Sequence, residues 1–83
     1  MVVMASVLVN SKPSAEGVVP EALKKVPEVS GAHMVHGVYD TIAWVESKAM
    51  QELRDVIGFK IRLFDNIRST LTTICLGVYN SVW

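Results

Sequence analysis

The chain has 83 residues, of which 51% are hydrophobic, and its eight Lys and Arg residues balance eight Asp and Glu residues. A chain of this length forms one domain at most, and it buries only about 60% of the surface that it exposes when unfolded. We therefore expect residues 1–83 to form a single domain. The zero formal charge provides no basic stripe for a phosphate backbone, so we expect no direct binding of nucleic acid.

Small folds are commonly stabilised by disulfides, metals or oligomerisation. Cys75 is the single cysteine, so no intrachain disulfide can form, and no Cys or His cluster has the spacing of metal ligands. We expect neither a metal nor a cofactor, and we expect Cys75 to be a buried, inert thiol. Oligomerisation with other copies of the chain is the favoured stabiliser.

The apolar N-terminal stretch 1–9 has no positively charged start and is followed by the turn residues Asn10-Ser11-Lys12-Pro13. It is too short for a membrane span and wrongly flanked for a signal peptide. A lone thiol without a secretory signal suits a reducing compartment. The sequence therefore predicts a cytoplasmic protein without a membrane partner.

The first half of the chain begins with a strand over 2–9, and the turn residues 10–14 follow it. Ser14 is a candidate N-cap of the first helix. Regular helix is expected from about Val19 to Val26, because Pro20 then occupies the first position, where its missing N–H costs nothing.

Two strands are expected next, over 29–36 and 40–46, joined by a short connection. A second helix is expected over 47–63, with Ser47 as its cap, and a last strand over 67–78. The role of the tail 79–83 is left open. The second helix has an apolar stripe with spacings of three and four residues: Met50, Leu53, Ile57, Ile61 and Phe64.

The order β-α-β-β-α-β predicts an α+β, ferredoxin-like fold, with an antiparallel four-stranded sheet and two helices on one face. In the first strand Val7 and Val9 occupy one side, whereas Met4 and Leu8 occupy the other, so both sides are apolar. A sheet with one wet face should alternate apolar and polar residues. A second subunit covering the open face would explain the pattern, and chance hydrophobicity is the alternative.

The connection around Gly37, Tyr39 and Asp40 joins a permissive glycine, a phenol and a carboxylate. Gly37 is expected to supply a positive φ in the turn. One carboxylate near exposed backbone amides can hold the ammonium and the carboxylate of a small zwitterion. The alternatives are that Asp40 only caps the turn and that Tyr39 only fills an interface.

Thr70 and Thr72 are two residues apart in the last strand, so they lie on the same side of it. Two hydroxyls on one face can both bond a ligand carboxylate, although threonine is also a common strand residue without any further role. The topology places Asp40, Thr70 and Asn10 at one end of the sheet, with two strands to cross, roughly 10 Å.

Other candidate residues point to packing. His33 and His36 are three apart in a predicted strand, hence on opposite faces, and are unsuited to hold one metal. Either histidine would suit an interface, as a neutral or pH-sensitive group. Trp44 and Trp83 are expected to be packing residues.

Four segments, in order, resemble the effector-binding domain of the Lrp/AsnC regulator family, also called the RAM domain. They cover nearly the whole chain, from about residue 4 to residue 76. The matching pieces are Ala5-Ser6-Val7-Leu8-Val9-Asn10, Ala22-Leu23-Lys24-Lys25-Val26-Pro27-Glu28-Val29, Gly37-Val38-Tyr39-Asp40-Thr41-Ile42-Ala43 and Ile67-Arg68-Ser69-Thr70-Leu71-Thr72-Thr73-Ile74.

The resemblance implies a dimeric α/β barrel, higher assemblies such as octameric rings, and an amino-acid effector held between dimers. It maps ligand binding to Gly37, Tyr39, Asp40, Thr70 and Thr72. The helix-turn-helix that precedes this domain in full-length members has no counterpart here, since Met1 opens directly into the first strand. The chain therefore resembles a stand-alone effector domain, for which full-length Lrp/AsnC regulators are candidate partners.

Three functions follow as hypotheses. The leading one is a homo-oligomeric sensor of an amino acid or related small molecule, without catalytic residues. The second is a small dimeric α/β-barrel enzyme of monooxygenase or isomerase type, which requires an enclosed cavity and a base such as His33 or His36. The third is a structural partner of other family oligomers that binds no ligand.

Overall fold

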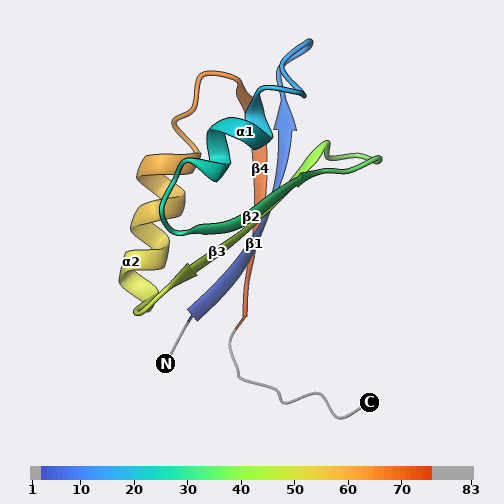
Figure 1. Cartoon of the computed structure of the whole chain (residues 1–83). Helices are drawn as coiled ribbons and strands as arrows, with labels where there is room; N and C mark the ends of the chain where they lie inside the picture. Colours follow the sequence, from blue (N-terminus) through green and yellow to red (C-terminus); the bar gives the residue numbers. More distant parts are fainter. Residues whose placement is uncertain (1–2, 76–83) are drawn as a thin grey trace, which may run out of the picture.

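The first strand, β1 (Val3–Ser11), is a central strand of the sheet in the computed structural model, which describes residues 3–75. It pairs antiparallel with β3 (Thr41–Ser47) on one side and with β4 (Ile67–Ile74) on the other. β2 (Val29–Met34) pairs antiparallel with β3, which gives the strand order β2-β3-β1-β4 (Figure 1). The expected ferredoxin-like α+β fold is confirmed.

Two strands end at other residues than the sequence predicts. β1 continues to Ser11, because Ser11 pairs with Ile67 of β4. β2 ends at Met34, two residues early. Residues 1–2 and 76–83, which include the predicted end of the last strand, Trp83 and the tail, lie outside the described residues.

The first helix, α1 (Val19–Lys24), begins where Pro20 predicts it. The proline lies in the first turn, where a backbone donor is not needed. The expected cap at Ser14 is wrong, because Val18 is the N-cap residue and makes no side-chain cap. Ser14 instead turns the chain with a φ of 69°, in the left-handed region that few non-glycine residues adopt.

The second helix consists of α2 (Met50–Asp55) and a π-helical continuation, η1 (Val56–Ile61). The predicted cap at Ser47 is wrong, because β3 extends through Ser47, which pairs with Val3. The Ser47 hydroxyl donates to a carboxylate within α2 at 2.9 Å and does not cap the helix. No signal in the sequence predicts the π-helical turn.

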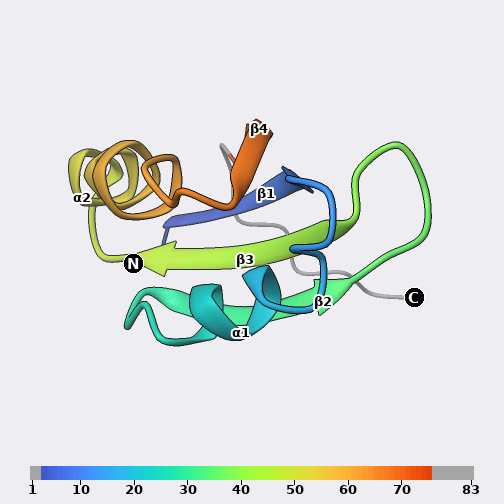
Figure 2. The ribbon, with the colours of Figure 1, turned by 90° about the horizontal axis from the view of Figure 1, so that it is seen from above.

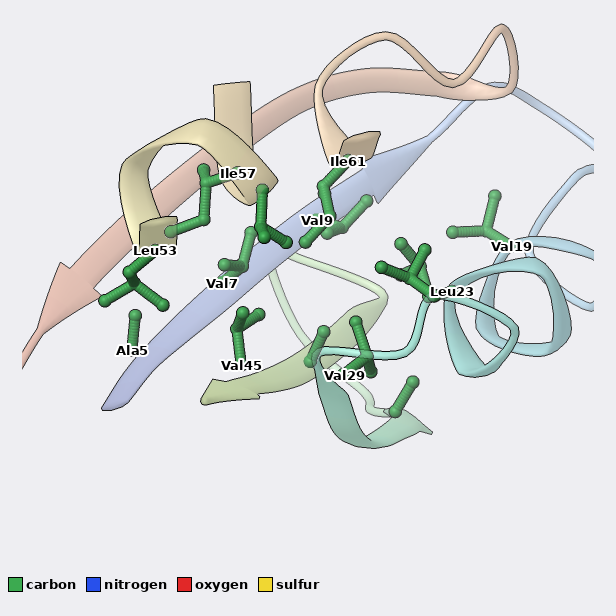
Figure 3. Packing of buried hydrophobic residues seen from close by; sticks show 14 of the residues in the cluster. Ala5, Val7, Val9, Val19, Leu23, Val29, Val45, Leu53, Ile57 and Ile61 are labelled. Carbon is green, nitrogen blue, oxygen red and sulfur yellow. The ribbon is translucent and has the colours of Figure 1, made fainter. Parts of the chain in front are cut away.

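The hydrophobic core lies between one face of the sheet and the helices (Figure 3). α1 packs against β2 and β3, whereas α2 packs against β3 and β1. The predicted apolar stripe of the second helix is confirmed, with Leu53, Ile57 and Ile61 buried and Met50 and Phe64 partly buried. Its sheet partners are the buried residues Ala5, Val7, Val9, Ala43 and Val45.

The other face of the sheet is not covered by either helix. Leu8 pairs with Leu71 on one side and with Ile42 on the other, which gives an apolar row across three strands. Trp44 lies on the same face and is 38% exposed. Cys75 is also exposed, so the prediction of a buried thiol is wrong; it follows the end of β4, beyond the cover of the helices.

Candidate functional site

An open hollow lies between β4 and the α2–η1 segment, with a volume of about 460 Å³. It exists because α2 packs over β1 and β3 and leaves the neighbouring face of β4 with little cover (Figure 1). Small-molecule sites commonly enclose about 300–1,000 Å³. The hollow is therefore large enough for a small metabolite.

The strand side of the hollow is formed by Thr70 and Thr72. They pair with Val9 and Val7 of β1, whose side chains are buried under the helices. Because directly opposed residues of an antiparallel pair point to the same face, both threonines face the helices. The prediction that the two hydroxyls share one side of the strand is confirmed.

The helix side of the hollow is formed by Arg54, Gly58 and Arg62. Their spacing of four residues places them on one face of the segment. A Cβ atom built on Gly58 meets no other atom within 4 Å, so the glycine leaves open space there. The other lining residues are Ile57, Leu71 and Ile74; the Leu71 side chain points to the opposite face of the sheet, so Ile57 and Ile74 supply the apolar lining.

Asp40 lies in the connection between β2 and β3 and bonds the end of β1. Its carboxylate accepts hydrogen bonds from the Ser11 N–H at 3.0 and 3.2 Å and from the Ser11 hydroxyl at 2.8 Å. The Thr41 hydroxyl donates to the same carboxylate at 3.3 Å. Ser11 and Thr41 are buried, so Asp40 has a structural role in satisfying their polar groups.

The connection itself, residues 35–40, extends beyond the sheet (Figure 2). It is closed by a hydrogen bond from the Val35 N–H to the Asp40 carbonyl, at 2.9 Å. Gly37 is exposed and does not have a positive φ, so that expectation is wrong. The turn reaches its shape through this backbone bond instead. Tyr39 is half-buried.

The predicted site residues fall into two groups in one copy of the chain. Thr70 and Thr72 line the hollow, whereas Gly37, Tyr39 and Asp40 do not. Asp40 bonds the end of β1 from the β3 side, while β4 lies on the opposite side of β1. The expected placement of Asp40 and Thr70 at one end of the sheet is correct, but within one copy the two groups lie on opposite sides of β1.

Asn10 does not belong to either group. It pairs with Ser69, next to Thr70, so its side chain lies on the opposite sheet face from Thr70. Arg54 and Arg62 were not predicted, since exposed charges on a helix usually face solvent. The signal that points to them is an Arg-x₃-Gly-x₃-Arg spacing. On a helix this spacing places two arginines on one face, with a glycine that has no side chain between them.

The histidines are exposed, His33 in β2 and His36 in the connection that follows. Among residues 3–75, no three or more His, Cys, Asp or Glu side chains are grouped to hold a metal ion. Within the same range, no helix has the length and hydropathy needed to cross a membrane.

A family model described as the Lrp/AsnC ligand-binding domain matches residues 3–81. The chain belongs to this family. The curated relatives that the chain matches are named HTH-type transcriptional regulators. The Lrp/AsnC resemblance inferred from the four segments is thereby confirmed.

Among proteins of known sequence, the chain is similar to an uncharacterised HTH-type transcriptional regulator of Pyrococcus abyssi, with 34% identity over 92% of this chain and 48% of that protein. The chain spans about half the length of the curated relatives that it matches.

Two solved structures share the fold. A crystal structure of a Thermus thermophilus protein has a TM-score of 0.88 at 28% identity, and the alignment covers 95% of this chain and 99% of that one. An L-methionine complex of a Neisseria meningitidis transcriptional regulator has a TM-score of 0.79 at 12% identity, covering 95% and 53% of the two chains.

Proposed function

We propose that this domain is a homo-oligomeric regulatory module that binds a small-molecule effector, an amino acid, in the cytoplasm. The observation that carries the proposal is the hollow of about 460 Å³ between β4 and the α2–η1 segment, lined by Thr70 and Thr72. The match to a ligand-binding family supports a binding role for this hollow, and the L-methionine complex of a protein with the same fold supports an amino acid as the ligand.

The uncovered sheet face supports self-association. Leu8, Ile42 and Leu71 form an apolar row there, and Trp44 is beside it. A strand with one face in water normally alternates apolar and polar residues, so that its water-facing positions are polar. On this face, three of those positions are apolar. A second copy stacked on this face removes the row from water and forms a dimeric α/β barrel.

The complete effector site requires that dimers associate further, for example into an octamer. The connection 35–40 of one copy would lie against the hollow of another, which joins Gly37, Tyr39 and Asp40 to Thr70 and Thr72. Val38 at the tip of the connection is 85% exposed, as an arm that contacts another copy would be. The Oδ2 atom of Asp40 accepts from one donor only and retains room for an ammonium group.

The mechanism is then a shift in assembly state, because a ligand that binds only between copies stabilises the oligomer in which its site is complete. The module acts alone or by association with full-length Lrp/AsnC regulators, which would carry the DNA contact. That residues 1–83 act as a single unit without a helix-turn-helix stays a prediction.

The alternative of a barrel enzyme receives no support from the site. The hollow is open to the edge of the sheet, and neither His33 nor His36 lines it. A structural partner without a ligand remains the competing function, since it uses the same apolar face but no hollow.

A thermal-shift screen of the twenty amino acids, combined with light scattering, tests the proposal. We expect at least one amino acid to raise the melting temperature and change the mass. Thr72→Val should abolish that shift, because it removes a hydroxyl from the hollow at nearly constant volume. Thr73→Val is the matched control, since Thr73 pairs with Ser6 on the other face. If no amino acid changes either quantity, the module does not sense amino acids.

A further inference from the structure

The hollow beside β4 has two positive charges and no negative charge among its lining residues. Arg54 lies on its wall at one end of the Arg-x₃-Gly-x₃-Arg face and Arg62 at the other. Thr70 and Thr72 add two hydroxyls, which can donate to an anion. Within one copy, a neutral zwitterion would find partners for its carboxylate here and none for its ammonium group.

The two arginines are not neutralised within the described part of the chain. The ion pairs found there join Lys24 to Glu21 and Lys60 to Glu28. Asp55, the carboxylate next to Arg54 in the sequence, accepts a hydrogen bond from Gln51 at 3.0 Å. Both guanidinium groups are therefore available to a ligand.

The spacing of the two cations suits a ligand with an acidic group at each end. Arg54 and Arg62 each lie four residues from Gly58, one before it and one after it, so the two cations lie at opposite ends of this face. Their long side chains can approach each other over Gly58, where no side chain intervenes. Each planar guanidinium matches a carboxylate in two parallel hydrogen bonds.

The apolar lining suits the carbon chain between two acidic groups. Ile57 and Ile74 contribute apolar side chains to the hollow, and Ile57 is buried. Methylene groups of a short dicarboxylate would lie against these side chains and be removed from water. The chemistry of the hollow thus matches an anion with an aliphatic centre.

We propose that the effector is a small dicarboxylate anion, with one carboxylate bound by Arg54 and the other by Arg62 and the threonine hydroxyls. This inference rests on the proposed function, because it assigns the ligand class of the same site. Two sources share this chemistry: an acidic amino acid, whose ammonium group would contact Asp40 of another copy, and a dicarboxylic acid without an amino group.

Titration calorimetry with glutamate, glutarate and glutamine tests the proposal, since glutamine has the shape of glutamate without its second charge. We expect glutamate or glutarate to bind at least about tenfold more tightly than glutamine, because a charge-assisted hydrogen-bond pair is lost. Preference for glutamate assigns the amino acid as the source, and equal binding of glutarate assigns the plain acid. The affinity should also fall as salt is raised.

Arg54→Gln and Arg62→Gln should each weaken binding of the dicarboxylate by about tenfold. Both side chains are exposed, so the variants should fold. Arg68→Gln is the matched control, because Arg68 is an exposed arginine at the start of β4 that does not line the hollow. Wild-type affinity in both hollow variants would overturn the proposal.

The binding experiments also distinguish failure of this inference from failure of the proposed function. Binding of glutamine, or of another neutral amino acid, at least as tight as that of glutamate and glutarate overturns the dicarboxylate and leaves the sensor intact. Failure of glutamate and glutarate to bind, while the twenty-amino-acid screen finds another effector, has the same meaning. Failure of every ligand to bind overturns both.

Discussion

At the scale of single residues, Asp40 stabilises the junction between β1 and β3. Its carboxylate accepts the backbone N–H and the hydroxyl of Ser11, a residue that is buried. Asp40→Ala leaves these donors without a partner, which costs about 1–3 kcal/mol. Urea denaturation followed by circular dichroism should show this loss.

Asp65→Ala is the control for Asp40→Ala, because Asp65 is an exposed turn residue before β4. We expect its unfolding free energy to change by less than about 0.5 kcal/mol. Equal midpoints for the two variants would show that the Asp40 bonds contribute nothing. Asp40→Asn, which keeps an acceptor oxygen, is the better variant for ligand-binding experiments.

Glu28, just before β2, is linked to η1 by an ion pair with Lys60 at 3.1 Å. The hydrogen bond from Lys60 and the backbone amide of Glu28 hold the pKa of this carboxyl below its ordinary value of 4.5. A depressed carboxyl pKa stabilises the fold above the ordinary value, and that stability is lost as the pH falls through the lowered value.

Lys60→Gln should therefore reduce stability at neutral pH and have little effect well below pH 4.5. Because both side chains are partly exposed, the loss at pH 7 should not exceed about 1 kcal/mol. Unfolding free energies measured from pH 7 down to pH 3 test this. A difference between wild type and variant that stays constant over the range would contradict it.

At the scale of elements, the α2–η1 segment holds the sheet through one apolar face. Leu53 is fully buried against the sheet, whereas Leu63, just beyond η1, is 68% exposed. Leu53→Ala should cost about 2–5 kcal/mol, because it leaves a cavity in the core. Leu63→Ala should change the stability by less than about 0.5 kcal/mol. Guanidinium denaturation of both variants measures the difference, and similar losses would contradict the assigned face.

The order of elements could be predicted because local patterns determine it. The stripe through Leu53, Ile57 and Ile61 has helical spacing, and Pro20 marks the start of α1. The errors arise where residues far away in the sequence determine the end of a strand or helix. Ser11 belongs to β1 because it pairs with Ile67 of β4, and Ser47 belongs to β3 because it pairs with Val3.

The candidate site was only half predictable for the same reason. Thr70 and Thr72 share a face by strand alternation, which a sequence shows directly. That this face is turned toward Arg54 and Arg62 depends on how far the α2–η1 segment lies from β4. No local pattern specifies that distance, so the two arginines resembled ordinary solvent-exposed charges.

At the scale of the whole molecule, a large aromatic side chain on the uncovered sheet face can be compared with one on the outer side of the helices, to test which surface contacts a second copy. Trp44 lies on the sheet face and is 38% exposed, whereas Phe59 lies on η1 and is 71% exposed. If the sheet face is covered by a second copy, Trp44→Lys should dissociate the dimer, since it would bury an unpaired charge. Phe59→Lys should leave the mass unchanged.

Sedimentation equilibrium over a range of protein concentrations measures both variants. The apparent melting temperature of the wild type should also rise with concentration, because association stabilises only the folded chain. A wild-type monomer at all concentrations, or the same mass for wild type and Trp44→Lys, would contradict coverage of this face.

The separation of the two groups of predicted site residues on opposite sides of β1 has a geometric consequence. If the connection of one copy meets the hollow of the next, the contact is head-to-tail, and the row of copies keeps one unused connection at one end and one unused hollow at the other until it closes. The angle between successive copies then decides between a self-limiting circle and an open filament. A small change in the pitch of the connection would alter that outcome while each folded unit stayed the same.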